Sequence, residues 1–333
     1  MGIEKVRVSI GSASVLGLDV SIKPKDPPTT CYLMTYIKGH CSANCAFCPQ
    51  ARGSDSSTEK LSRVNWPVYP IEEVVNKLKN LPVDKSFKRI CIQTLNYPNN
   101  FVDIIDIVNK ISHLYNGPIS VAIPPLSKER LKELKRIGIS RVGIALDGAT
   151  PEIFNEVKGS EVKGPYHWDE HFKCLKDALD VFQEGHVSTH LIVGLGETQE
   201  EILRIIMKLH ELKITVALFA FTPIKGTKLE KMTQPQIFDF RRIQLGRYLI
   251  VSNILSLEDF TFDDDGTLIK INISREKLRD IIDNSDAFMT SGCPGCNRPY
   301  YTSRPSGPIY NYPRILSNNE NEEIFNLLKE HIN

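Results

Sequence analysis

The sequence has little of what membrane, secreted and nucleic-acid-binding proteins show. None of its 333 residues belong to an apolar run that approaches membrane-spanning length, and its first residues lack the apolar core of a signal peptide. The 41 basic and 40 acidic residues give a net charge of +1, so no bulk field favours nucleic acid or an anionic membrane. Eight cysteines are too few for a disulfide scaffold in so long a chain. We therefore expect a soluble cytoplasmic protein that binds neither nucleic acid nor membrane.

Short apolar runs alternate with amphipathic helical patterns along most of the chain. This alternation predicts a parallel sheet of the α/β class, and with six to eight units it favours a (β/α)8-type (TIM-like) barrel, complete or partial. We expect an N-terminal arm at 1–30, a barrel at 31–300 and a C-terminal extension at 301–333. The expected strands are 31–37, 89–94, 119–123, 141–146, 187–193 and 214–221, with 268–273 and 287–290 as candidates for strands seven and eight.

The most informative stretch follows the first expected strand and holds Cys41, Cys45 and Cys48. Three thiolates at these spacings can bind three irons of a cubane [4Fe–4S] cluster and leave the fourth iron open to an outside ligand. A structural zinc site usually takes four ligands, commonly as two separated pairs, and a disulfide would leave one thiol over. The cluster is therefore the preferred interpretation, and its place at the end of a strand is where barrel enzymes carry their chemistry.

A second set of cysteines could bind another cluster. Cys293 and Cys296 form a chelating pair after the last expected strand, for which a redox disulfide and zinc are alternatives. Cys91 and Cys31 lie in the first two strands and would complete four thiolates, enough for a second [4Fe–4S] cluster, although single strand cysteines are more often inert core residues. Cys174 falls in the apolar stripe of a helix and is expected in the outer core.

The three-cysteine run, with Phe47 just before its last cysteine, resembles the signature of the radical S-adenosylmethionine (SAM) enzymes. From residue 31 to about 290 the chain resembles biotin synthase, in the Cys-Pro-Gln continuation at 48–50, in Cys91, in Leu-Asp at 146–147 and in Val-Gly-Leu-Gly-Glu-Thr at 193–198. It departs from that family at Ser188, which stands where a biotin synthase has a cysteine ligand.

The resemblance implies that SAM binds the open iron and that one electron cleaves it to a 5′-deoxyadenosyl radical, which takes hydrogen from carbon. It places Phe47 against the adenine and Asp147 on the ribose, with a turn-capping role for Asp147 as the alternative. A basic side chain for the SAM carboxylate would be His171 in the first turn of a helix; an exposed or capping histidine is the alternative. The adenine-side motif after strand five contains Ile192, Gly194 and Glu197.

The ending from Cys293 to Tyr301 and the stretches at 31–36 and 91–98 are similar to the two-component lipoyl synthases. That resemblance implies a radical SAM sulfurtransferase that inserts sulfur from the second cluster into the octanoyl chain of a lipoyl carrier protein. Its partners would be that carrier, a homologous second component and an electron donor such as ferredoxin. Should Cys31 not be a ligand, Ser306 or a small molecule could take the fourth iron of the second cluster. The alternatives are biotin synthase, another radical SAM enzyme with an auxiliary cluster, and a non-catalytic iron–sulfur scaffold.

Overall fold

One large sheet organises the chain, and the computed structural model describes residues 2–331 of it. Its strand order is β10-β9-β8-β7-β6-β2-β1-β5. Six of these strands are mutually parallel, as expected: β2 (Thr30–Thr35), β6 (Arg89–Gln93), β7 (Ile119–Ala122), β8 (Ile139–Gly143), β9 (Val187–Val193) and β10 (Thr215–Ala220). The fold is therefore a partial (β/α)8 barrel, which confirms the predicted class.

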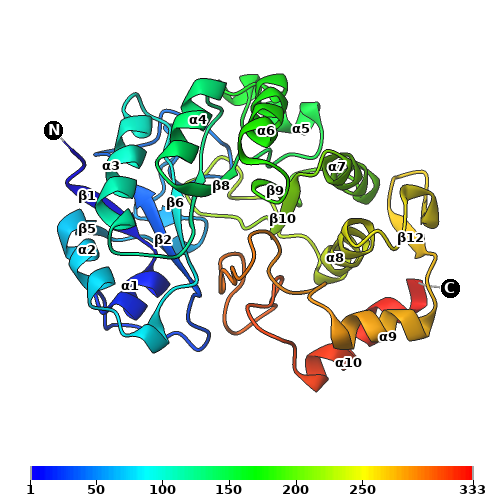
Figure 1. Ribbon diagram of the computed structural model, residues 1–333. Helices are drawn as coiled ribbons and strands as arrows, with labels where there is room; N and C mark the ends of the chain where they lie inside the picture. Colours follow the sequence, from blue (N-terminus) through cyan, green and yellow to red (C-terminus); the bar gives the residue numbers. More distant parts are fainter. Residues whose placement is uncertain (1, 332–333) are drawn as a thin grey trace.

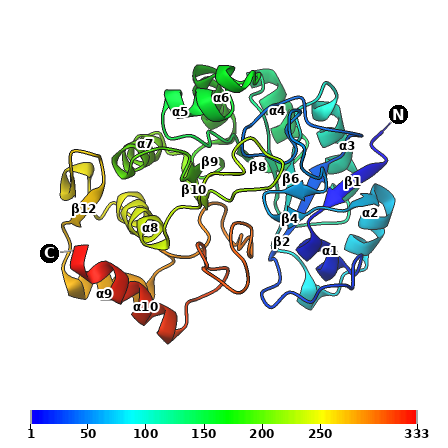
Figure 2. The same cartoon turned by 180° about the vertical axis from the view of Figure 1, so that it is seen from behind.

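Helices surround this sheet on its outer side (Figures 1 and 2). They are α1 (Ile10–Leu16), α2 (Ile71–Lys79), α3 (Asn100–Ser112), α4 (Lys128–Arg136), α5 (Pro151–Val157), α6 (Trp168–Phe182), α7 (Gln199–Glu211) and α8 (Ile237–Val251). Their starts are set by local sequence: Thr198 and Glu201, for example, form a reciprocal capping box at the first turn of α7. No helix in the described part of the chain has the length and apolar character needed to cross a bilayer.

Part of the segment predicted as an arm belongs to the sheet. Strand β1 (Lys5–Val8) pairs antiparallel with β2 and also with β5 (Val68–Pro70). Val6 and Val8 are fully buried against the helix layer, which explains why this segment joins the sheet. A short hairpin of β3 (Lys60–Leu61) and β4 (Val64–Asn65) follows the three-cysteine loop.

The predicted strands seven and eight are wrong. Strand β12 (Leu268–Ile271) pairs antiparallel with β11 (Phe260–Phe262) in a separate two-stranded sheet, and only the two end residues of β12 are buried. A barrel strand is buried on both faces and needs a longer apolar run. Residues 287–290 contribute one bridge, from Met289 to Tyr312. Helices α9 (Arg275–Asn284) and α10 (Asn318–Leu328) pack together beyond α8 (Figure 1).

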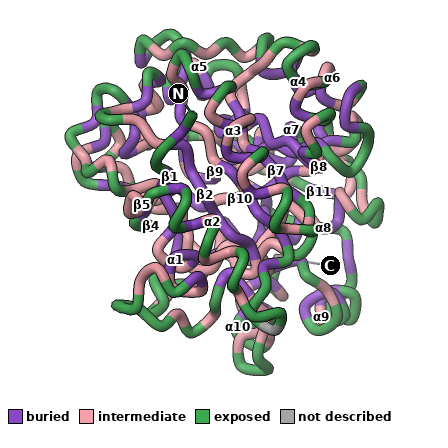
Figure 3. The backbone as a smooth tube through the Cα atoms, turned by 60° about the vertical axis from the view of Figure 1, so that its left-hand side comes forward, coloured by how far each residue is buried: buried purple, intermediate pink, exposed green. Residues whose placement is uncertain are grey.

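Strand alternation separates two packed regions. Buried residues follow the strands through the middle of the molecule (Figure 3). Cys31 and Leu33 on β2 join the main core between sheet and helices. Tyr32 and Met34, which alternate with them, join a second cluster on the inner face together with Cys91. The inner face of the sheet is therefore the side on which a site can form.

The C-terminal loop occupies the place of the missing strands. It crosses between α8 and the N-terminal half of the sheet in both views (Figures 1 and 2). Ser291 and Asn311 bond the backbone of Leu218 on the free edge of β10, with the hydroxyl of Ser291 accepting from its N–H at 2.9 Å. Gly292, at φ 122°, approaches so closely that an added Cβ would lie 3.0 Å from that of Ala217. The loop thus provides hydrogen-bond partners for the edge of β10, which a further strand would otherwise cover.

Candidate functional site

A cavity of about 730 Å³ lies on the inner face of the sheet. Phe47 and Cys48 of the three-cysteine loop line one part of it. Cys91, Cys293 and Cys296 line another part of the same cavity. One thiol of the first proposed set and three of the second therefore open into one shared space, which Cys41, Cys45 and Cys31 do not line.

The three-cysteine loop is clamped by three other loops at the strand ends. The backbone N–H of Ser42 donates to Asn96 O after β6 at 2.7 Å, and that of Ala46 donates to Val157 O at the end of α5, also at 2.7 Å. Ala46 O in turn accepts from Leu229, which follows β10. This cross-bracing fixes the loop over the mouth of the partial barrel.

The thiols of this loop suit an iron–sulfur cluster. Burial raises the pKa of all three, to about 12 for Cys45, so an unligated thiolate would be unfavourable there. The sulfur of Cys41 accepts backbone N–H bonds from Ala43 at 3.4 Å and from Asn96 at 3.1 Å, the kind of contact that tunes cluster potentials. Among residues 2–331 no three His, Cys, Asp or Glu side chains converge on one metal ion. A cubane needs no such convergence, because each thiolate binds a different iron.

Asp147 lines the cavity in a strained conformation that β9 holds in place. Its φ is +65°, its N–H donates to His190 O at 2.8 Å, and its carbonyl accepts from Ile192 at 2.9 Å. Its carboxylate lies 2.7 Å from the ammonium group of Lys158, which also donates to Ala145 O at 2.8 Å. Asp147 is thus accessible for a polar ligand group, and its charge is already balanced.

Sequence reasoning missed Lys158. Its ammonium group is buried, sits over the rings of Phe154 and Tyr166, and counteracts the effect of burial on the pKa of Cys45. A cation therefore lies beside the cluster loop. A lone lysine after an apolar helix carries no periodic signal that could have identified it. His190, Arg298 and Tyr301 also line the cavity and were likewise not singled out.

The predicted adenine-side residues divide into two roles. Ile192 lines the cavity and packs with Phe47 and Phe221. Glu197 is not among the lining residues; its carboxylate accepts the N–H groups of Gly194 at 2.6 Å and Leu195 at 3.0 Å. Glu197 and Gly194 therefore shape the loop, and Ile192 and Phe47 supply its apolar surface toward the cavity.

His171 does not fit its predicted role. The side chain is buried and does not line the cavity, and its ring packs edge-on against Phe154 at 4.9 Å and Tyr166 at 5.2 Å. Burial, together with the nearby Lys158 ammonium, lowers the pKa of His171 to about 3. A neutral, enclosed imidazole cannot serve as the cation for a carboxylate. Lys158 is the cation that this region holds.

The second thiol set lies deeper on the inner face. Burial raises the pKa of Cys91 to about 12, and the nearby Cys293 and Cys296 thiols add to that increase. Gln93 Nε2 lies 3.2 Å from the Cys91 sulfur, and the Tyr32 hydroxyl lies 3.0 Å from the Cys296 sulfur. Three thiols, two of them with polar contacts to sulfur, are thus gathered from β6 and the closing loop.

Three guanidinium groups lie near Cys293. Arg89, Arg141 and Arg298 each counteract the raised pKa of Cys293, and none of the three forms an ion pair with a carboxylate within the described chain. Arg141 lies on the inner row Tyr32–Cys91–Ser120–Arg141 that the strand registers define. Buried positive charges need a negative partner, which a thiolate-bound cluster would supply.

Cys31 does not belong to this set. It is fully buried in the core between sheet and helices, on the face of β2 opposite to Tyr32. The period of two along a strand contradicts the expectation that Cys31 is a ligand. Ser188 lines the cavity, Ser306 is exposed, and Cys174 lies in the outer core as expected.

Comparison with known proteins agrees with this geometry. A biotin synthase of Methanococcus aeolicus is 27% identical over 203 residues, which cover 60% of this chain and 57% of that protein. A biotin synthase of Crocosphaera subtropica is 24% identical and covers 68% and 58%. The chain thus spans less than two thirds of the length of these curated relatives.

Solved structures support the fold. The hydrogenase maturase HydG aligns with a TM-score of 0.54 at 17% identity, over 72% of this chain and 57% of HydG. Methylornithine synthase (PylB) aligns with a TM-score of 0.52 at 13% identity, over 73% and 76%. The profile of the Radical SAM superfamily matches residues 35–209, which begin at the end of β2, include the cluster loop and end within α7. With more than half of the chain matched and three thiols held at the strand ends, the chain belongs to the radical SAM superfamily.

Proposed function

We propose that the chain is a radical SAM sulfurtransferase that inserts sulfur into the octanoyl chain of a lipoyl carrier protein, as one component of a lipoyl synthase. The observation that carries the proposal is the shared cavity, which Phe47 and Cys48 of the three-cysteine loop line together with Cys91, Cys293 and Cys296. An aliphatic chain between two such sets could lose hydrogen on one side and gain sulfur from the other. A homologous second component and a reducing protein such as ferredoxin complete the proposal.

The family implies a [4Fe–4S] cluster and SAM, for which Cys41, Cys45 and Cys48 provide the thiolates. When bound, that group supplies a radical able to take hydrogen from unactivated carbon, and a second cluster would supply sulfur. In this arrangement Asp147 and Ile192 orient SAM. Cys91, Cys293 and Cys296 would hold the second cluster, and a non-thiolate group would complete its ligands.

The remaining cavity residues position the substrate and exclude water. Phe219 and Tyr301 lie edge to face at 5.5 Å, and burial, together with the nearby Cys48 and Cys91 thiols, raises the pKa of Tyr301. Tyr301 therefore lies near a thiol of each cysteine set. Such apolar surface suits an acyl chain and keeps water from a reactive intermediate.

Biotin synthase is the second candidate, because the curated relatives carry that name. The chain departs from it at Ser188 and gathers its second thiol set through a C-terminal loop. The two functions differ in substrate: one acts on a protein-bound octanoyl group, the other on a free small molecule.

One experiment separates these functions. The anaerobically reconstituted protein is reduced with SAM and either an octanoylated lipoyl peptide, its 8-thiolated form, or dethiobiotin. We expect 5′-deoxyadenosine and a mass increase from sulfur on one of the two lipoyl peptides, and none on dethiobiotin. Thiolation of dethiobiotin would establish biotin synthase instead, and absence of 5′-deoxyadenosine under every condition would favour a non-catalytic scaffold. A variant with Cys41, Cys45 and Cys48 all replaced by alanine is the control and should lack about four irons per chain.

A further inference from the structure

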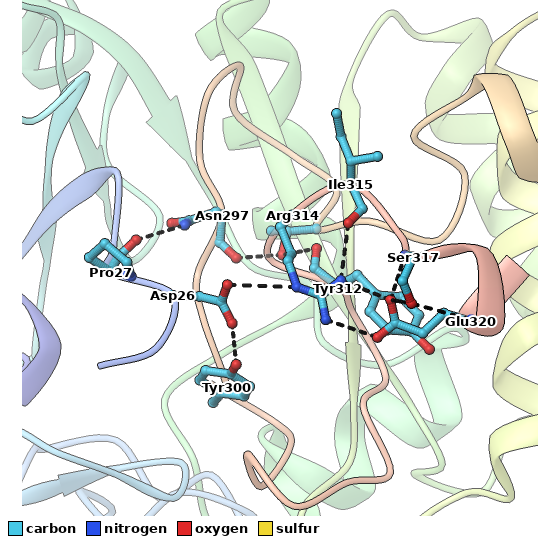
Figure 4. A network of polar contacts seen from close by, with 10 residues as sticks. Asp26, Pro27, Asn297, Tyr300, Tyr312, Arg314, Ile315, Ser317 and Glu320 are labelled. Atoms are coloured by element: carbon cyan, nitrogen blue, oxygen red, sulfur yellow. Dashed lines mark hydrogen bonds and ion pairs between the residues drawn. The ribbon is translucent and has the colours of Figure 1, made fainter. Parts of the chain in front are cut away.

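The mouth of the cavity is framed by two segments that are far apart in sequence. Residues 22–26 and 61–66 both line it, together with the C-terminal loop at 298–302. Figure 4 shows how the first of these segments is fastened to that loop: Asp26 contacts the Tyr300 hydroxyl and lies 3.7 Å from Arg314, and Asn297 donates to Pro27 O at 3.0 Å. The mouth therefore has a defined rim.

The rim carries an excess of unpaired positive charge. Asp26 and Asp147 are the carboxylates that line the cavity. Lys158 pairs with Asp147, and Arg314 lies 3.7 Å from Asp26 and also pairs with Glu320 at 2.8 Å. Lys23, Lys25 and Arg63 also line it, and none of these three forms an ion pair with a carboxylate among residues 2–331.

Two of the cations at the rim repel one another. Arg63 donates to the carbonyls of Tyr300 at 3.0 Å and Ser303 at 2.6 Å, and burial, together with the neighbouring Arg304 guanidinium, lowers the pKa of Arg63. Arg304 itself is exposed and has no carboxylate partner in the described chain. Like charges held together without a counter-charge favour an incoming anionic surface.

Apolar side chains stand beside these charges. Val20 is 92% exposed and Ile22 is 38% exposed, in the segment that leads into Lys23. A small free substrate that enters the cavity would leave such side chains in water. A protein surface laid on the rim would cover them, as the apolar parts of interfaces do.

We infer that the rim of Lys23, Lys25, Arg63 and Arg304 is the docking surface for an acidic carrier domain that presents an acyl-lysine to the cavity. The inference rests on the proposed function and adds the surface that selects the carrier. The positive rim steers and orients the domain, Val20 and Ile22 contact it, and the lysine-linked chain enters the cavity at this rim. Binding of this kind weakens as salt rises.

Reversing the charge of exposed rim residues tests the inference and leaves the buried residues unchanged. A rim variant carries Lys23→Glu, Lys25→Glu and Arg304→Glu; Arg63 is kept because its contacts hold the loop. A matched control carries Lys132→Glu, Lys176→Glu and Lys270→Glu, exposed lysines of α4, α6 and β12, none of which lines the cavity. Both variants have the same net charge. A difference between them therefore reports the effect of the rim residues and not that of the protein's total charge.

The readout is the dissociation constant of the holoenzyme for an octanoylated carrier domain, measured anaerobically by calorimetry at two salt concentrations. We expect the rim variant to bind roughly tenfold more weakly, or worse, and the control to bind as the parent does. A short octanoyl-lysine peptide, which lacks the carrier surface, should lose much less kcat/KM than the whole domain. Equal binding by parent and rim variant, or equal weakening in rim variant and control, would overturn the docking surface. Failure of the proposed function would give a different result, because the parent protein itself would then add sulfur to neither the peptide nor the domain.

Discussion

Replacing Lys158 with methionine should destabilise the protein by about 3 kcal/mol, since removing one partner of a buried ion pair leaves the other charge uncompensated. The Lys158 and Asp147 side chains are 5% and 11% exposed, and their charged atoms are 2.7 Å apart. The change also deprives Ala145 O of a donor at 2.8 Å. Because Asp147 borders the cavity, water can reach it, which places the loss near the lower end of the range for buried pairs.

Urea unfolding of the apo protein measures this loss, with Lys176→Met on the exposed side of α6 as a control for the loss of a lysine. The double variant Lys158→Met with Asp147→Asn removes both charges and should recover much of the stability. A change of less than about 1 kcal/mol in Lys158→Met, or no recovery in the double variant, would show that the pair is not the buried interaction described here.

Further predictions concern the thiols, a buried histidine and the closing loop. Cys31→Ala should keep the parent's iron content, whereas Cys91→Ala should lose the irons of the second cluster and still cleave SAM; equal iron loss in both, measured by iron analysis, would contradict the assignment. His171 stays neutral in the folded protein, because its pKa is about 3 against an ordinary value of 6.5. The free energy of unfolding should therefore fall as the pH drops from 6.5 toward 3, by up to about 1.4 kcal/mol per pH unit. His171→Phe should reduce that slope in denaturant titrations. Gly292→Ala should displace the loop from Ala217 and lower occupancy of the second cluster by Mössbauer spectroscopy, leaving the first unchanged.

The repeating part of the fold could be predicted because each strand and each helix has its own local sequence signal. A strand such as β9 is a short apolar run, and a helix such as α7 has a capping residue and a periodic apolar face. The six parallel strands and their helices were identified for this reason. The cluster loop was likewise predictable, since its three thiols are close in sequence.

Other features depend on which way a side chain faces or on contacts distant in sequence. Cys31 and Cys91 look alike as strand cysteines, and a one-residue difference in phase sends Cys31 to the helix side. His171 occupies the expected helix turn, yet Phe154 and Tyr166 enclose it. Strand β1 carries few residues and pairs with a segment more than 20 positions later, which periodicity does not reveal.

The use of a loop in place of two strands bears on how the second thiol set is built. A strand would have fixed Cys293 and Cys296 through regular backbone pairing, whereas the loop relies on side-chain bonds to β10 and on the fastening of Asp26 to Tyr300 and Arg314. These contacts join the rim of the cavity to the segment that bears two of the three thiols. Under the proposed function, a carrier that docks on the rim would contact the same loop that holds Cys293 and Cys296, so that docking and the placement of these thiols would be linked through residues 297–300.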